Sequence, residues 1–119
     1  MKKKTLLLSL SAVFLWSCSD NSPDDLIDAT PVNEVTYQAH VKPIIDNNCI
    51  SCHAEPPISG APISLTTYDQ VKTAVESHGL INRISKEETD GELMPLGGPK
   101  LPQNLINIII QWQTDGFKN

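Results

Sequence analysis

Apolar residues recur three or four positions apart in four segments of the chain, which is the spacing of one helix face. No segment shows the sustained alternation of apolar and polar residues that is typical of strands. We therefore predict an all-α fold of three to four helices. The apolar positions are Tyr37, Val41, Ile44 and Ile45; Tyr68, Val71, Ala74 and Val75; Leu80, Ile81 and Ile84; and Leu105, Ile108, Ile109 and Trp112, with Ile106 and Ile110 widening the last face.

Helix breakers and capping residues separate these segments. We expect Pro43 to kink the first helix or to mark its restart, because proline lacks the N–H that a helix interior uses. Two stretches rich in proline and glycine, 54–63 and 89–100, are predicted loops. We expect the first helix to begin at Thr36. The second helix should begin at Thr66 or Thr67 and end near Gly79. The last helix should have Pro102 as its first residue and end at Gly116.

The segment before these helices has the layout of an export signal. Three lysines precede an apolar run, so residues 1–17 are predicted to be a signal peptide. Its 11 uncharged residues from Leu6 to Trp16 would cover roughly 16 Å as a helix, too little to span a bilayer. The sequence Leu-Trp-Ser-Cys ending at Cys18 resembles a bacterial lipobox, which implies an acylated Cys18. An ordinary signal peptide and a buried N-terminal helix are the alternatives.

Residues 18–33 are predicted to be an acidic flexible tether, and residues 34–119 the folded domain. The start of the tether, Ser19-Asp20, also resembles an export signal of Gram-negative lipoproteins. We therefore expect an exported lipoprotein on the periplasmic or outer surface of a Gram-negative bacterium, attached to the membrane by its lipid anchor only.

Composition and charge narrow the classes of partner. The 119 residues carry a formal net charge of −5, and removing the signal peptide with its three lysines makes the charge −8. Such an acidic chain is not expected to bind nucleic acid. Only 5% of the residues are aromatic, so the domain is expected to have a modest core that something else helps to fill.

The residues with the clearest chemistry are Cys49, Cys52 and His53, in the sequence Cys-Ile-Ser-Cys-His. This C-x-x-C-H spacing is typical of covalent attachment of haem c. Two thiols about one helical turn apart can add to the two vinyl groups along one porphyrin edge, which leaves the histidine as the proximal iron ligand. Export supports this interpretation, because haem c is attached outside the cytoplasm.

Three other interpretations use the same residues. A thioredoxin-like dithiol needs a βαβ context that the chain lacks. A structural zinc site needs a fourth ligand, such as His40 or His78. A disulfide between the two cysteines of the motif would leave the histidine unexplained.

Met94 is the candidate sixth ligand. It is the one methionine that would remain after signal removal, and it lies 41 residues after His53 in a loop rich in proline and glycine. A rigid loop of this kind can hold a thioether over the distal haem face. A gap-filling core methionine, or ligation by His78 or His40, are the alternatives.

The pattern as a whole resembles a class I monohaem cytochrome c domain. The similarity covers residues 35–116, from the helix before the cysteine motif to the isoleucine-rich last helix with Trp112. It implies crossed first and last helices around a haem cleft, ligation by His53 and Met94, and support of the histidine by Pro56 or Pro57.

These features together predict a one-electron carrier rather than an enzyme. Its partners are expected to be redox proteins with a basic docking patch, because the chain is acidic. The alternatives are a haem-based sensor or ligand-binding lipoprotein, and a structural module that holds zinc with the same cysteines and histidine.

Overall fold

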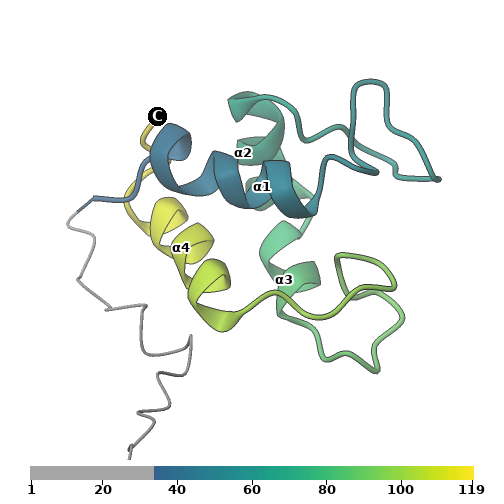
Figure 1. Ribbon diagram of the computed structural model, residues 1–119. Coiled ribbons are helices and arrows are strands. Elements are labelled where there is room, and N and C mark those ends of the chain that lie inside the picture. The colour runs from purple at the N-terminus through teal and green to yellow at the C-terminus, as the bar shows by residue number, and fades with distance from the viewer. Residues whose placement is uncertain (1–33) are drawn as a thin grey trace, which may run out of the picture. The chain divides into compact units, whose positions relative to one another are not determined.

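Helices are the only regular elements in residues 34–119, which are the residues that this computed structural model describes (Figure 1). The all-α prediction is confirmed for this part of the chain. The predicted signal peptide, Cys18 and the acidic tether lie outside the described residues. The elements are η2 (Tyr37–Val41), α1 (Lys42–Asn48), α2 (Tyr68–Ser77), α3 (Leu80–Ser85) and α4 (Gln103–Thr114).

Pro43 divides the first helical segment into two parts. Residues Tyr37–Val41 form a wide π-helical turn, and the α-helical part begins at Lys42. Pro43 lies in the first turn of α1, where a missing N–H costs no intrahelical hydrogen bond. The predicted restart at this proline is therefore confirmed, and the predicted face is buried along both parts.

A capping box begins α2. The Thr67 hydroxyl accepts a hydrogen bond from the Gln70 N–H, and the Gln70 side chain accepts one from the Thr67 N–H. These bonds satisfy main-chain donors that have no partner within the helix. Gly79 separates α2 from α3 with a φ of 67°, a left-handed conformation that glycine adopts without steric cost. Both predicted boundaries are confirmed.

The buried face of α4 differs from the predicted one by a small rotation. Ile106, Ile109 and Trp112 are buried, whereas Leu105 and Ile108 are only half-buried at the edges of the face. The helix is apolar on more than one side, so its sequence alone does not fix which stripe faces the core. Pro102 also precedes the first helical residue instead of being that residue.

The two ends of the described chain meet over an aromatic cluster. The Tyr37 N–H donates to the Lys118 carbonyl at 2.8 Å, and α4 contacts both η2 and α3. The indole N–H of Trp112 also donates to the Lys118 carbonyl. The first and last helical segments of the described chain are therefore in contact, and their crossing around a haem cleft stays a prediction. The rings of the cluster, with centroids 4.8–5.7 Å apart in neighbouring pairs, are Tyr37, Tyr68, Trp112 and Phe117.

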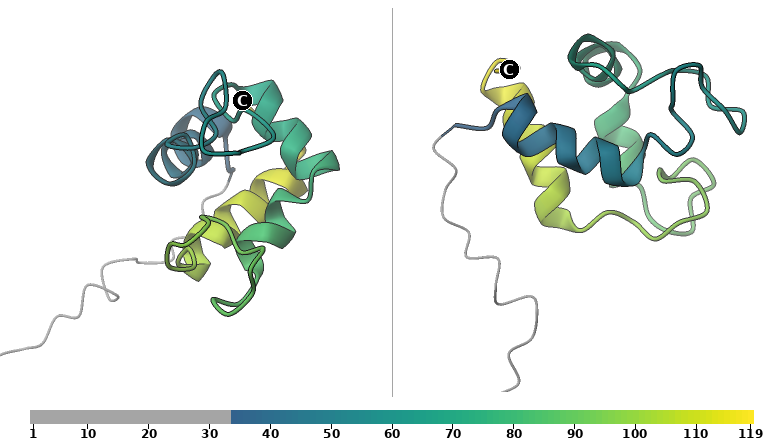
Figure 2. Two further views of the ribbon diagram at one scale, coloured as in Figure 1. Left: turned by 90° about the vertical axis from the view of Figure 1, so that its right-hand side faces the viewer. Right: turned by 45° about the horizontal axis from the view of Figure 1, so that its top comes forward.

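Two long loops lie on the same side of the helices. Figure 1 shows the loop between α1 and α2 above the end of α1, and the loop between α3 and α4 below it. The right-hand view of Figure 2 shows the same arrangement. The first loop begins with the cysteine motif and the second carries Met94, so the fold brings both predicted ligand regions to one side. Within residues 34–119, no helix has the length and hydrophobicity needed to cross a lipid bilayer.

Candidate functional site

The cysteine motif continues directly from the end of α1. The Cys49 N–H donates to the Ile45 carbonyl, and the N–H groups of Cys52 and His53 both donate to the Cys49 carbonyl, at 3.2 and 3.0 Å. These bonds keep residues 49–53 in a tight turn. The two cysteines and the histidine thus begin at defined positions on a rigid helix end, as attachment of one planar group at three points requires.

Two hydrogen bonds from the following loop hold His53. Its Nδ1 lies 2.8 Å from the Ile63 carbonyl oxygen, so Nδ1 carries the hydrogen and donates. The His53 carbonyl in turn accepts from the Leu65 N–H at 2.8 Å. With Nδ1 protonated, the neutral ring has its lone pair on Nε2. The structure therefore presents an imidazole whose orientation and tautomer suit binding to a metal through Nε2.

The hydrogen-bond acceptor of the His53 ring is a main-chain carbonyl of the loop, and the proline support implied by the resemblance stays a prediction. Pro56 and Pro57 lie early in the loop, just before a hydrogen bond from the Ile58 N–H to the Cys52 carbonyl. The Ile63 carbonyl, further along the loop, is the group that accepts from the ring. The Ile63 carbonyl could not be identified from the sequence, because any residue has a main-chain carbonyl and the path of the loop decides which one reaches the ring.

The cysteines are free thiols and are half-buried. Burial raises the pKa of Cys49 to about 11, so this thiol stays protonated at neutral pH. A nucleophilic dithiol of the thioredoxin type requires the opposite shift in pKa. Within residues 34–119, no three Cys, His, Asp or Glu side chains converge to hold a metal ion. Residues 34–119 thus show neither the lowered thiol pKa of a reactive dithiol at Cys49 nor a cluster of three such side chains.

Met94 lies at the edge of the same hydrophobic core as the motif. Cys49, Ile50, Ile63 and Met94 are all half-buried and pack against this core. The Met94 N–H donates to the Arg83 carbonyl at 3.1 Å, which attaches the loop to the end of α3. The thioether is thus neither fully buried nor freely exposed.

The two histidines considered as alternative ligands have other surroundings. His40 accepts a hydrogen bond from the Thr36 N–H on its Nδ1, at 3.0 Å, and so satisfies a donor at the start of η2. His78 is exposed at the C-terminal end of α2. Neither ring hydrogen-bonds to a residue of the cysteine motif. Met94 is the candidate that lies with Cys49 against the core.

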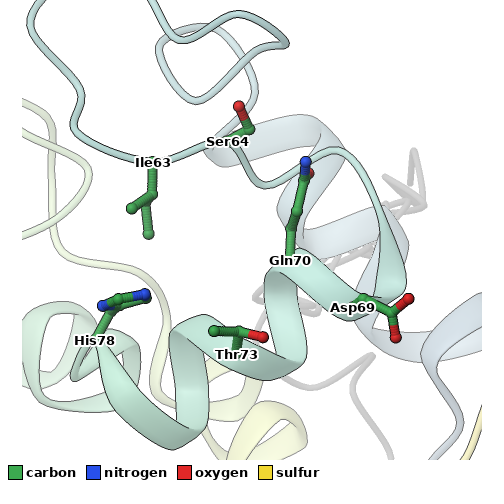
Figure 3. A pocket seen from close by; sticks show the side chains of 6 residues that line it. All are labelled: Ile63, Ser64, Asp69, Gln70, Thr73 and His78. Atoms are coloured by element: carbon green, nitrogen blue, oxygen red, sulfur yellow. The ribbon is translucent and has the colours of Figure 1, made fainter.

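A pocket of about 330 Å³ separates α2 from the segment that holds His53 (Figure 3). The Ile63 side chain and the His78 ring lie on opposite sides of it, and Thr73 lies on the α2 side. Neither the cysteines nor Met94 line this pocket, so it is not a complete cofactor site. Its lining residues are Ile63, Ser64, Asp69, Gln70, Thr73 and His78.

Comparisons with protein-family models, with curated proteins and with solved structures found no match for this chain. Two free thiols three positions apart, an imidazole with an available Nε2 and a half-buried thioether fit a haem with two thioether bonds and two axial ligands.

Proposed function

We propose that the protein is a one-electron carrier with a single covalently bound haem c. Cys49 and Cys52 would hold it through thioether bonds, and His53 and Met94 would be the axial ligands. In each attachment the sulfur forms a bond to a vinyl carbon and the thiol hydrogen goes to the neighbouring carbon, so no oxidant is consumed. When bound, the haem supplies an iron that alternates between Fe(II) and Fe(III).

The orientation of His53 carries the proposal. An exposed histidine after two cysteines is a sequence pattern, but a histidine whose Nδ1 donates to a main-chain carbonyl at 2.8 Å has a fixed ring plane. The hydrogen bond also makes the ring a better electron donor through Nε2. This arrangement is the one that metal-ligating histidines typically use.

Met94 defines the kind of haem protein that we propose. A thioether on the distal side would complete the coordination of the iron, so that no position is left for a substrate or a small gas. Electron transfer without substrate chemistry is the activity that such a site supports, and we therefore propose that the protein is not an enzyme. Methionine ligation stabilises the ferrous state and favours a relatively high potential.

The setting that we propose is outside the cytoplasm. Acylated Cys18 would anchor the protein to a membrane on the periplasmic or outer surface of a Gram-negative bacterium. The mature charge of −8 favours a redox partner with a basic docking patch. Exposed apolar side chains at Ile58 and Leu96, one on each long loop, would allow a small and transient contact on the side of both loops.

Absorption spectroscopy of the full chain, produced in a periplasm with haem-attachment machinery, tests the proposal. The expected product is red, with covalent haem and the spectrum of a six-coordinate low-spin iron in both redox states. The ferric charge-transfer band of sulfur ligation should disappear in Met94→Ala. It should persist in Leu96→Ala, the matched control, because Leu96 is in the same loop and its side chain is 70% exposed.

Other outcomes would replace the proposal with a named alternative. A colourless product that contains zinc would show a structural module. A five-coordinate high-spin spectrum in the unmodified chain would favour a sensor or ligand-binding lipoprotein. A sulfur band that survives in Met94→Ala would remove the proposed role of Met94.

A further inference from the structure

Charged residues gather around the segment that leads to Met94. The Lys86 ammonium, just past the end of α3, lies 2.9 Å from a carboxylate oxygen of Asp90 and 3.1 Å from one of Glu92. The Arg83 guanidinium, on α3 itself, lies 3.7 Å from the other Glu92 oxygen. Two cations at the end of one helix thus hold two carboxylates that precede Met94 by four and two residues.

Hydrogen bonds of the main chain connect the segment before Met94 to the residues that form these ion pairs. The Glu92 N–H donates to the second Asp90 carboxylate oxygen at 2.8 Å, and the Leu93 N–H donates to the Asp90 carbonyl. Leu93 is buried, and Met94 donates its N–H to the Arg83 carbonyl. Movement of Glu92 away from α3 would therefore pull on the residues that place the Met94 side chain.

We call the cluster of Arg83, Lys86, Asp90 and Glu92 the ionic clamp. Lys86 is at its centre, and the Lys86 side chain is only 22% exposed, less than the side chains of the other three residues. The hydrogen bond to Asp90 is the main cause that raises the Lys86 pKa, and the Glu92 N–H is the main cause that lowers the Asp90 pKa. Both groups therefore stay charged near neutral pH, and the Arg83 and Lys86 cations together balance the two carboxylates.

We propose that Lys86 is a positioning residue for Met94, and that the ionic clamp keeps the Met94 loop closed against the end of α3. This proposal rests on the proposed function, since it gives Met94 the role of an axial ligand. Loss of the clamp would not remove the thioether. It would increase the fraction of molecules in which the loop is open and the distal position is free.

The expected change in the open fraction is modest, because the residues of the ionic clamp are partly exposed to solvent. Isolated surface ion pairs stabilise little, but clamp residues share partners and span a loop, so their loss is expected to raise the open fraction about three- to tenfold. Such a change is too small to unfold the domain. It is large enough to measure with an external ligand that binds only the open form.

Imidazole binding to the ferric haem-loaded protein measures the open fraction, because imidazole must displace Met94. Lys86→Gln should bind imidazole about three- to tenfold more tightly than the unmodified protein. Lys86→Arg keeps the positive charge and should restore most of the original affinity. Lys42→Gln is the matched control, since it removes another lysine paired with an aspartate four residues later, on α1 and outside the Met94 loop.

Salt provides a second measurement on the unmodified chain, which needs no variant to fold. Higher ionic strength should weaken the clamp and strengthen imidazole binding, and the salt effect should be smaller in Lys86→Gln. Equal imidazole affinity in Lys86→Gln and Lys42→Gln, or no salt effect in the unmodified protein, would overturn the role of the clamp. Absence of a sulfur-ligation band in the unmodified protein would instead overturn the proposed function.

Discussion

Single polar groups hold distant segments of this protein together by binding main-chain atoms. His53 binds the carbonyl of Ile63, and an Asp115 carboxylate oxygen accepts the N–H of Val35 at 3.0 Å. The sequence identified His53 as a candidate ligand by its place after two cysteines. It could not identify its partner, because a main-chain acceptor leaves no trace in the residue type.

Replacing Asp115 by Asn should lower the melting temperature of the full chain at pH 7. The Val35 N–H, followed by the Gln111 side chain, lowers the Asp115 pKa, so the charged form stabilises the fold. A group with a lowered folded-state pKa contributes this stability above its unfolded pKa of about 3.9, and loses it as the pH falls through the folded value. The difference between the two proteins should therefore shrink below about pH 4.

Thermal melts followed by circular dichroism from pH 7 to pH 3 measure this difference. Glu76→Gln is the control, since Glu76 is an exposed carboxylate on α2 that makes no hydrogen bond or ion pair within residues 34–119. A difference between Asp115→Asn and the unmodified chain that stays constant over this pH range would refute the role of the charge.

The ends of the helices were easier to predict from the sequence than the faces that the helices bury. Local chemistry fixes a boundary: the hydroxyl of Thr67, the left-handed conformation at Gly79 and the missing N–H of Pro43 act over a few residues. A buried face depends on which neighbouring helix is present. The isoleucines of α4 cover several sides, so only the packing against η2 and α3 selects the side with Ile106.

The two isoleucines at the edges of the predicted α4 face provide a direct comparison. Ile106 is fully buried, so Ile106→Ala should lower the free energy of unfolding by about 2–5 kcal/mol, through lost transfer free energy and the cavity left behind. Ile110 is 38% exposed, and Ile110→Ala should cost less than about 1 kcal/mol. Urea denaturation of the full chain measures both values. Equal losses would mean that the face is not rotated as described.

At the scale of the whole molecule, the sequence predicted the helical class of residues 34–119 but not the path of the long loops. The two loops have no periodic pattern, and their course depends on contacts such as the bond from Met94 to Arg83. The ionic clamp also escaped prediction. The spacing of Lys86 and Asp90, four residues apart, was a usable signal, but such pairs are common on protein surfaces and only the structure connects this one to Met94.

The net charge leads to a prediction about electron exchange. If the partner has a basic patch, the rate at which it reduces the protein should fall about tenfold as the ionic strength rises from about 0.01 M to about 0.15 M, because salt screens the attraction. Stopped-flow measurement with a basic redox protein gives this rate. An uncharged small reductant is the control and should show little change. A rate with the basic partner that is indifferent to salt would exclude electrostatic attraction.

The contact between Tyr37 and Lys118 also sets an order in time. The first helix cannot complete its packing until residues 112–118 have been synthesised, because they supply the indole ring, the Phe117 ring and the carbonyl that accepts the Tyr37 N–H. The cysteine motif comes about sixty residues earlier in the chain. In a growing chain, the motif is therefore present while the core is still open, before residues 112–118 can complete the packing of the first helix.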